Sequence, residues 1–139
     1  MTPTEPPRLV EVLAEYDRLV EVGIGNRPDV AVALAARGVT VRATDRVERS
    51  VPAGVSFALD DVTGPDEEVY ADADAIYALR MPPELQRATR RVSSAVGAPF
   101  LFTTLGGDPA VIPAERKTVR EGTLFVAPAG GRGVGQTRN

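Results

Sequence analysis

Short apolar runs alternate with longer amphipathic segments over most of the chain. Five apolar-leaning runs have the length expected of a strand: residues 18–22, 39–45, 55–59, 73–79 and 99–105. Apolar positions at helical spacing predict helices over residues 8–17, 26–38 and 82–96, with one or two helical turns over residues 65–71. Strands that alternate with helices predict parallel βαβ units. We therefore expect an α/β fold with a doubly wound, mostly parallel, Rossmann-like sheet and helices on both faces.

Residues typical of helix ends support two of these helices. Asn26 can cap free backbone amides, Pro28 fits the first turn, and Gly38 suits the left-handed position after the last turn. In the same way Pro82-Pro83 opens the helix over 82–96 and Gly97 closes it. The pattern therefore predicts where both helices begin and end.

The last part of the chain departs from this alternation. Residues 118–126 contain two short β-prone runs around Glu121-Gly122, which predict a small antiparallel hairpin. We expect an extended leader over residues 1–7, one Rossmann-like nucleotide-binding domain over 8–128 and a flexible tail over 129–139.

Composition excludes several classes of chemistry. The 139 residues include no cysteine and no histidine, so thiolate or imidazole metal sites, cysteine nucleophiles and Ser-His-Asp triads are excluded, and no metal is expected. A net charge of −3 without a basic block makes nucleic acid an unfavoured partner. Neither an apolar run of membrane-spanning length nor a signal-peptide pattern is present in the sequence, so no membrane association and a cytoplasmic location are expected.

A strand, a glycine turn and a helix follow one another over residues 19–31. Gly23 allows a sharp turn, Gly25 lets the backbone approach a ligand without a Cβ clash, and the following helix presents free amides. Asp45 ends the second strand 20 residues after Gly25, where a carboxylate can accept hydrogen bonds from ribose hydroxyls. Together these features predict nucleotide binding.

The type of nucleotide depends on the residues around the turn. The dinucleotide fingerprint has a third glycine where Pro28 stands. With Glu21 two residues before Gly23, the segment resembles motif I of the class I S-adenosylmethionine-dependent methyltransferases, in which an acidic residue steadies the loop near the amino-acid end of the cofactor. The resemblance covers residues 9 to about 105 and departs at Arg27, where many members have a third glycine.

This resemblance implies a set of cofactor-binding residues. Glu21, Gly23 and Gly25 match the motif, Asp45 matches the ribose-binding acidic residue, and Asp61-Val62 resembles the pair that contacts adenine. We group with them Asn26, which follows the turn. In the alternative interpretation Glu21 is a paired carboxylate at a sheet edge and Asp61 caps a turn at Thr63-Gly64.

The segment YALRMPPELQ, residues 77–86, is similar to a small archaeal family described only as an uncharacterised, methyltransferase-like protein family. Methyltransferases that act on amino groups often carry Asn-Pro-Pro-Tyr at this place. Here Arg80 and Met81 precede the prolines and Glu84 follows them, so the amide that would bind an amine is missing. The resemblance implies Arg80 and Glu84 as catalytic candidates, with structural roles as the alternative, and Tyr77 is expected to pack in the core.

These observations leave more than one function open. The first hypothesis is a methyltransferase that uses S-adenosylmethionine and acts on an unknown acceptor by in-line transfer, which needs no strong general base. Only 34 residues follow Leu105, so a second copy of the chain or a partner protein is expected to complete the site. The second is a non-catalytic module that binds or senses S-adenosylmethionine or NAD(P), with Arg46 meeting a 2′-phosphate. The third is a structural or assembly protein that has lost its ligand.

Overall fold

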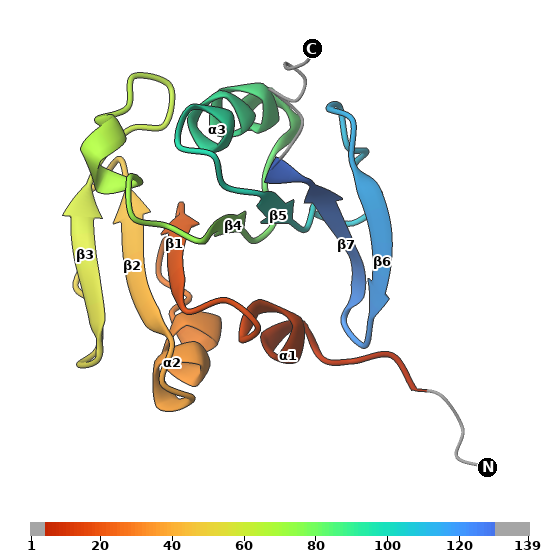
Figure 1. Ribbon diagram of the computed structural model, residues 1–139, viewed down its shortest axis with the longest axis horizontal. Coiled ribbons are helices and arrows are strands. Elements are labelled where there is room, and N and C mark those ends of the chain that lie inside the picture. The colour runs from red at the N-terminus through yellow and green to blue at the C-terminus, as the bar shows by residue number, and fades with distance from the viewer. Residues whose placement is uncertain (1–4, 130–139) are drawn as a thin grey trace.

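The computed structural model describes residues 5–129, which form one seven-stranded sheet with helices on both faces (Figure 1). In chain order the elements are α1 (Leu9–Leu13), β1 (Arg18–Val22), α2 (Asp29–Ala36), β2 (Thr40–Asp45), β3 (Val55–Leu59), the single-turn 3-10 helix η1 (Glu67–Val69), β4 (Ala75–Ala78), α3 (Pro83–Ala95), β5 (Phe100–Phe102), β6 (Glu115–Val119) and β7 (Gly122–Ala127). The predicted α/β class and doubly wound sheet are confirmed.

The sheet has the strand order β3-β2-β1-β4-β5-β7-β6. All neighbouring pairs from β3 to β5 are parallel, whereas β7 runs antiparallel to both β5 and β6. The order 3-2-1-4-5 is that of the Rossmann sheet, in which the chain changes direction across the sheet between β1 and β4. Ligands of such sheets bind outside the carboxyl ends of the strands at this switch point.

Each face of the sheet is covered by its own apolar core. On one face α1 and α2 pack on β1 and β2 through residues that include Leu13, Leu34 and Val41. On the opposite face α3 packs through Val92 against a core that includes Phe100 (Figure 1). Because the central strands are buried on both sides, they have continuous apolar runs rather than strict alternation.

Two boundaries of the predicted helices differ from the structure by three residues or more. The helix predicted over 8–17 ends at Leu13, because the chain tightens into i→i+3 hydrogen bonds before it enters β1. The predicted cap at Asn26 is wrong: α2 has Pro28 as its N-cap, with no side-chain hydrogen bond, and begins at Asp29. The residues after the glycine turn therefore form a loop rather than a first helical turn.

The C-terminal hairpin is confirmed, although β6 begins at Glu115, three residues before the predicted start. Residues 5–7 lie against it, because the Arg120 backbone N–H donates to the Pro7 carbonyl at 2.9 Å and its guanidinium pairs with Glu5 at 2.8 Å. The rest of the predicted leader, residues 1–4, and residues 130–139 of the predicted tail lie outside the described residues. Within residues 5–129 every helix is too short or too polar to cross a membrane.

Candidate functional site

The glycine turn leaves β1 with its backbone in the left-handed region. Gly23 has a φ of 75° and Gly25 a φ of 57°, conformations that favour glycine. The N–H groups of Gly23 and Ile24 both donate to the Thr44 carbonyl, at 2.9 and 3.0 Å, which fixes the turn against β2. A Cβ atom added to either glycine would meet no heavy atom within 4 Å. The turn is therefore held from the sheet side and faces open space on the other.

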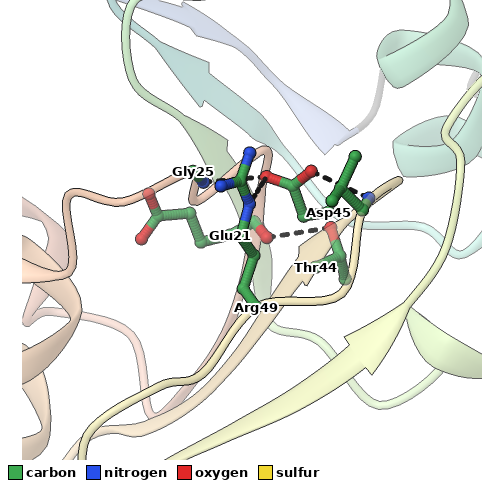
Figure 2. A network of polar contacts seen from close by, with 6 residues as sticks. Glu21, Gly25, Thr44, Asp45 and Arg49 are labelled. Carbon is green, nitrogen blue, oxygen red and sulfur yellow. Dashed lines mark hydrogen bonds and ion pairs between the residues drawn. The ribbon is translucent and has the colours of Figure 1, made fainter.

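Asp45 closes the turn from the end of β2 (Figure 2). Its Oδ2 accepts a hydrogen bond of 2.8 Å from the Gly25 N–H, and its Oδ1 accepts one of 3.1 Å from the Val47 N–H. The Arg49 Nε lies 3.5 Å from the same Oδ2 and is buried without a hydrogen bond. An ionised carboxylate has about four acceptor positions, so part of its capacity remains for a ligand.

Glu21 lies next to the turn, but its carboxylate does not contact Gly25 or Asp45. Its side chain is buried, and its Oε1 accepts a hydrogen bond of 2.6 Å from the Tyr77 hydroxyl. Burial raises the pKa of Glu21 to about 7, and the hydrogen bond from Tyr77 opposes part of this rise. Figure 2 shows the carboxylate directed away from the Gly25–Asp45 contact. Tyr77 is packed in the core as predicted, and it also orients Glu21.

Two hollows meet at the glycine turn. The β2-side hollow, of about 530 Å³, is lined by Val22, Gly23, Thr44, Asp45, Arg46, Asp60, Asp61, Val62, Thr63, Pro82, Glu84 and Leu85. The α2-side hollow, of about 310 Å³, is lined by Glu21, Gly23, Ile24, Gly25, Asn26, Arg27, Asp29, Val30, Leu79 and Arg80. Gly23 borders both. All seven predicted cofactor-binding residues line one of the two hollows.

The loop after β3 forms one wall of the β2-side hollow. Val62 is buried, whereas Asp61 is exposed and accepts hydrogen bonds from the Thr63 N–H at 2.9 Å and hydroxyl at 2.7 Å. These bonds lower the pKa of Asp61. The neighbouring Asp60 accepts from the Tyr70 hydroxyl at 2.6 Å. Within residues 5–129 no group of three or more acidic side chains is arranged to hold a metal ion.

The two predicted catalytic residues lie in different hollows. Glu84 is exposed on the first turn of α3 and lines the β2-side hollow. Arg80 follows β4 and lines the α2-side hollow, with a φ of 54°, the single positive value at a non-glycine residue within 5–129. The structure therefore does not bring Arg80 and Glu84 to one position, and only Arg80 adjoins Glu21 and Gly25.

Sequence reasoning missed two side chains that organise the site. Arg49 is bound by Asp45 from a loop without regular structure, so no helical or strand periodicity marks it. The Glu21–Tyr77 hydrogen bond joins residues 56 positions apart, and only the parallel register of β1 with β4 brings them together. That register places Tyr77 directly beside Glu21.

Comparison with known sequences places the chain among archaeal relatives. Residues 4–129 match the uncharacterised protein family UPF0146. A UPF0146 protein of Halobacterium salinarum is 59% identical over 125 residues, which are 89% of this chain and 97% of that protein. A UPF0146 protein of Archaeoglobus fulgidus is 48% identical over 103 residues, 73% of this chain and 79% of that protein.

Comparison with solved structures shows the fold. An RNA methyltransferase from Salinibacter ruber in complex with S-adenosyl-L-homocysteine is similar with a TM-score of 0.56 at 16% identity, over 91% of this chain and 94% of that chain. An N1-methyltransferase from Burkholderia thailandensis with bound S-adenosylhomocysteine has a TM-score of 0.50 at 17% identity, over 86% of this chain and 58% of that chain. A chain described as a zinc-dependent alcohol dehydrogenase from Rhodobacter sphaeroides has a TM-score of 0.50 at 18% identity, over 67% of this chain and 42% of that chain. These neighbours share a Rossmann-like sheet, and two of the three are methyltransferases.

Proposed function

We propose that this chain, which belongs to the uncharacterised protein family UPF0146, binds S-adenosylmethionine in the two hollows at the glycine turn and transfers its methyl group to an acceptor. The observation that carries the proposal is the turn itself. Two left-handed glycines face open space, and the second of them, Gly25, donates its N–H to the buried carboxylate of Asp45 at the end of the next strand. Such a turn at the switch point of a Rossmann sheet is suited to a nucleoside.

The shape of the site fits a ligand with two dissimilar ends. The β2-side hollow offers Asp45 to ribose hydroxyls and the buried Val62 to an adenine ring. The α2-side hollow begins on the other side of Gly23 and offers Glu21 and the backbone of Gly25 to the amino-acid end. An adenosine and an amino acid joined through sulfur would span the two hollows across Gly23.

Charge favours this ligand over a dinucleotide. Four carboxylates line the β2-side hollow, those of Asp45, Asp60, Asp61 and Glu84, against the single arginine Arg46. An acidic wall attracts a cationic sulfonium compound and repels a pyrophosphate or a 2′-phosphate. This argues against the NAD(P) alternative.

Methyl transfer requires the side chains mainly to align the acceptor with the methyl group. When bound, S-adenosylmethionine would supply a methyl group on a positively charged sulfur, which would leave with the electron pair of the C–S bond as the acceptor's lone pair bonds to the carbon. Holding the reacting atoms in line provides most of the acceleration. The chain's part is to fix the cofactor through the glycine turn and Asp45, and to hold the acceptor beside Arg80.

Isothermal titration calorimetry with S-adenosylmethionine, S-adenosylhomocysteine and NAD tests the binding step. We expect both S-adenosyl compounds to bind and NAD to bind more weakly or not at all. Tighter binding of NAD would contradict the proposal and favour the dinucleotide-binding module. Binding of the S-adenosyl compounds without transfer of a labelled methyl group to any fraction of a cell extract would leave a sensor rather than an enzyme.

A further inference from the structure

A third hollow adjoins the proposed cofactor site on the side of β5. This β5-side hollow has a volume of about 690 Å³ and borders the α2-side hollow, because Val30, Leu79 and Arg80 line both. Its further walls come from the loop after β5, residues 103–108, and from β6 and β7. It is larger than either of the two hollows at the glycine turn and lies beyond the amino-acid end of the proposed cofactor.

Arg80 stands at the junction of these two hollows and is held there by its backbone. Its N–H donates to the Thr103 hydroxyl at 2.9 Å, and the next N–H, of Met81, donates to the Thr103 carbonyl at 2.8 Å. These bonds maintain a left-handed φ of 54°, which is costly for any residue but glycine. Within the described residues the Arg80 guanidinium has neither an ion pair nor a hydrogen bond.

A second arginine, Arg116, also lines the β5-side hollow. Arg116 lies over the ring of Phe125 on the neighbouring strand, with 5.4 Å between its guanidinium carbon and the ring centroid. Stacking of this kind fixes a guanidinium while its N–H groups remain available in the plane. Over residues 5–129 the Arg116 side chain also has no carboxylate partner.

The β5-side hollow is also lined by two carboxylates, those of Asp108 and Glu121, which equal the two guanidinium groups in number. Within residues 5–129 neither carboxylate forms an ion pair with Arg80 or Arg116, and Glu121 accepts a hydrogen bond of 2.9 Å from the Leu9 N–H. Gly106 and Gly107 line the hollow as well, and their N–H groups donate to no backbone carbonyl of the described chain. Two arginines without an ion pair and two glycines with free N–H groups are suited to contact an anion directly.

We propose that the β5-side hollow binds the methyl acceptor through a negatively charged group of that acceptor, a carboxylate or a phosphate, held by Arg80 and Arg116. The assignment rests on the proposed function, because only a cofactor in the neighbouring hollow makes this ligand an acceptor. Arg80 adjoins both hollows, so it would bring the anionic group to a fixed distance from the methyl group.

The test follows the backbone amides of Gly106 and Gly107 by NMR while the protein, saturated with S-adenosylhomocysteine, is titrated with inorganic phosphate or with succinate. We expect at least one of the two anions to shift these amides saturably. The double variant R80Q/R116Q should weaken that binding by about tenfold or more, since two charge-assisted contacts are lost. The matched control R91Q removes an exposed arginine of α3 that lines none of these three hollows, and it should bind as the parent does.

The two anions separate the sources of negative charge: a response to succinate alone indicates a carboxylate acceptor, and a response to phosphate alone a phosphorylated one. No saturable shift with either anion, or equal affinity in parent and double variant, would overturn the anion site. Calorimetry of the single variant R116Q with S-adenosylhomocysteine should give an affinity within about twofold of the parent, because Arg116 lines neither of the two cofactor hollows. Anion binding by a protein that binds no S-adenosyl compound would overturn the proposed function, and with it the acceptor role, while leaving the anion site in place.

Discussion

Asp45 holds the glycine turn through the Gly25 N–H, and it also lines the hollow where a ribose would lie under the proposed function. Its spacing from Gly25 could be seen in the sequence, but the hydrogen bond to the turn could not, because it depends on how β1 and β2 pair. Removing the side chain therefore tests two effects at once, and two variants are needed to separate them.

For Asp45 we compare Asp45→Asn with Asp45→Ala. Both should weaken S-adenosylhomocysteine binding by about 1–3 kcal/mol, because charge-assisted hydrogen bonds to ribose are lost. Asp45→Asn keeps an oxygen for the Gly25 N–H and should stay within about 1 kcal/mol of the parent in urea unfolding. Asp45→Ala leaves two backbone N–H groups and Arg49 without their acceptor, so its stability should fall further. Unchanged affinity in both variants would remove Asp45 from the ribose site.

Glu21 should make the stability of the protein depend on pH. Its pKa rises from 4.5 to about 7 on folding, so between these values the folded state binds the proton more tightly than the unfolded state. Stability from this group is fully present below pH 4.5 and is lost as the pH rises through about 7, by up to about 3 kcal/mol.

Urea unfolding at pH 5 and pH 8 measures this effect. The parent should lose more stability between the two pH values than Glu21→Gln, which cannot ionise. Tyr77→Phe removes the hydrogen bond that opposes the rise, so it should move the Glu21 pKa upward. An identical pH dependence in the parent and Glu21→Gln would show that Glu21 does not titrate in this range.

At the scale of elements, the ends of β4 and β5 are joined through Thr103. The Thr103 N–H donates to Ala78 at 3.1 Å, while its carbonyl and hydroxyl accept from Met81 and Arg80. These hydrogen bonds hold Arg80, which is not a glycine, in the left-handed region. No sequence pattern indicated this conformation. Such strain is usual where a side chain must be held toward a ligand.

The strain at Arg80 predicts a reversal of the usual preference for alanine over glycine. Arg80→Gly should be more stable than Arg80→Ala by about 1 kcal/mol, because only glycine relieves the positive φ. The same pair of changes at Arg91, inside α3, should favour alanine by about 1 kcal/mol. Equal preference for alanine at both positions, measured by thermal unfolding, would contradict the left-handed conformation of Arg80.

Sequence patterns predicted the elements whose boundaries depend on nearby residues. They did not predict boundaries that depend on contacts with distant parts of the chain. The boundaries of β1 and β3 and the closing glycine of α3 follow from apolar runs and turn residues. The early end of α1 depends on its entry into β1, and the loop before α2 depends on the hold of Asp45 on Gly25. The spacing of the glycines and Asp45 predicted the candidate site, but not which hollow each side chain lines.

For the whole molecule, the distribution of charge matters more than its small net value of −3. Four carboxylates and one arginine line the β2-side hollow, whereas two carboxylates and two arginines line the β5-side hollow. The excess of negative charge therefore lies at the β2-side hollow. A cationic cofactor would be drawn to that hollow, and an anionic acceptor would depend on direct contacts with Arg80 and Arg116.

Salt should act differently on two nearly identical ligands. S-adenosylmethionine carries a sulfonium charge that S-adenosylhomocysteine lacks, so screening should weaken the former more. Between low salt and about 1 M salt we expect the ratio of their affinities to shift against S-adenosylmethionine by severalfold, about 1 kcal/mol. Calorimetry across this range provides the measurement, and a ratio that moves the other way would contradict the role given to the acidic wall.

The central claim is that an S-adenosyl compound occupies the glycine turn, and NMR titration of the amides with S-adenosylhomocysteine tests it most directly. We predict saturable shifts at Gly23, Gly25 and Asn26 and along residues 44–46 and 61–63, which line the two hollows on either side of the turn. Shifts confined to other parts of the chain, or no saturable shift at all, would contradict the claim.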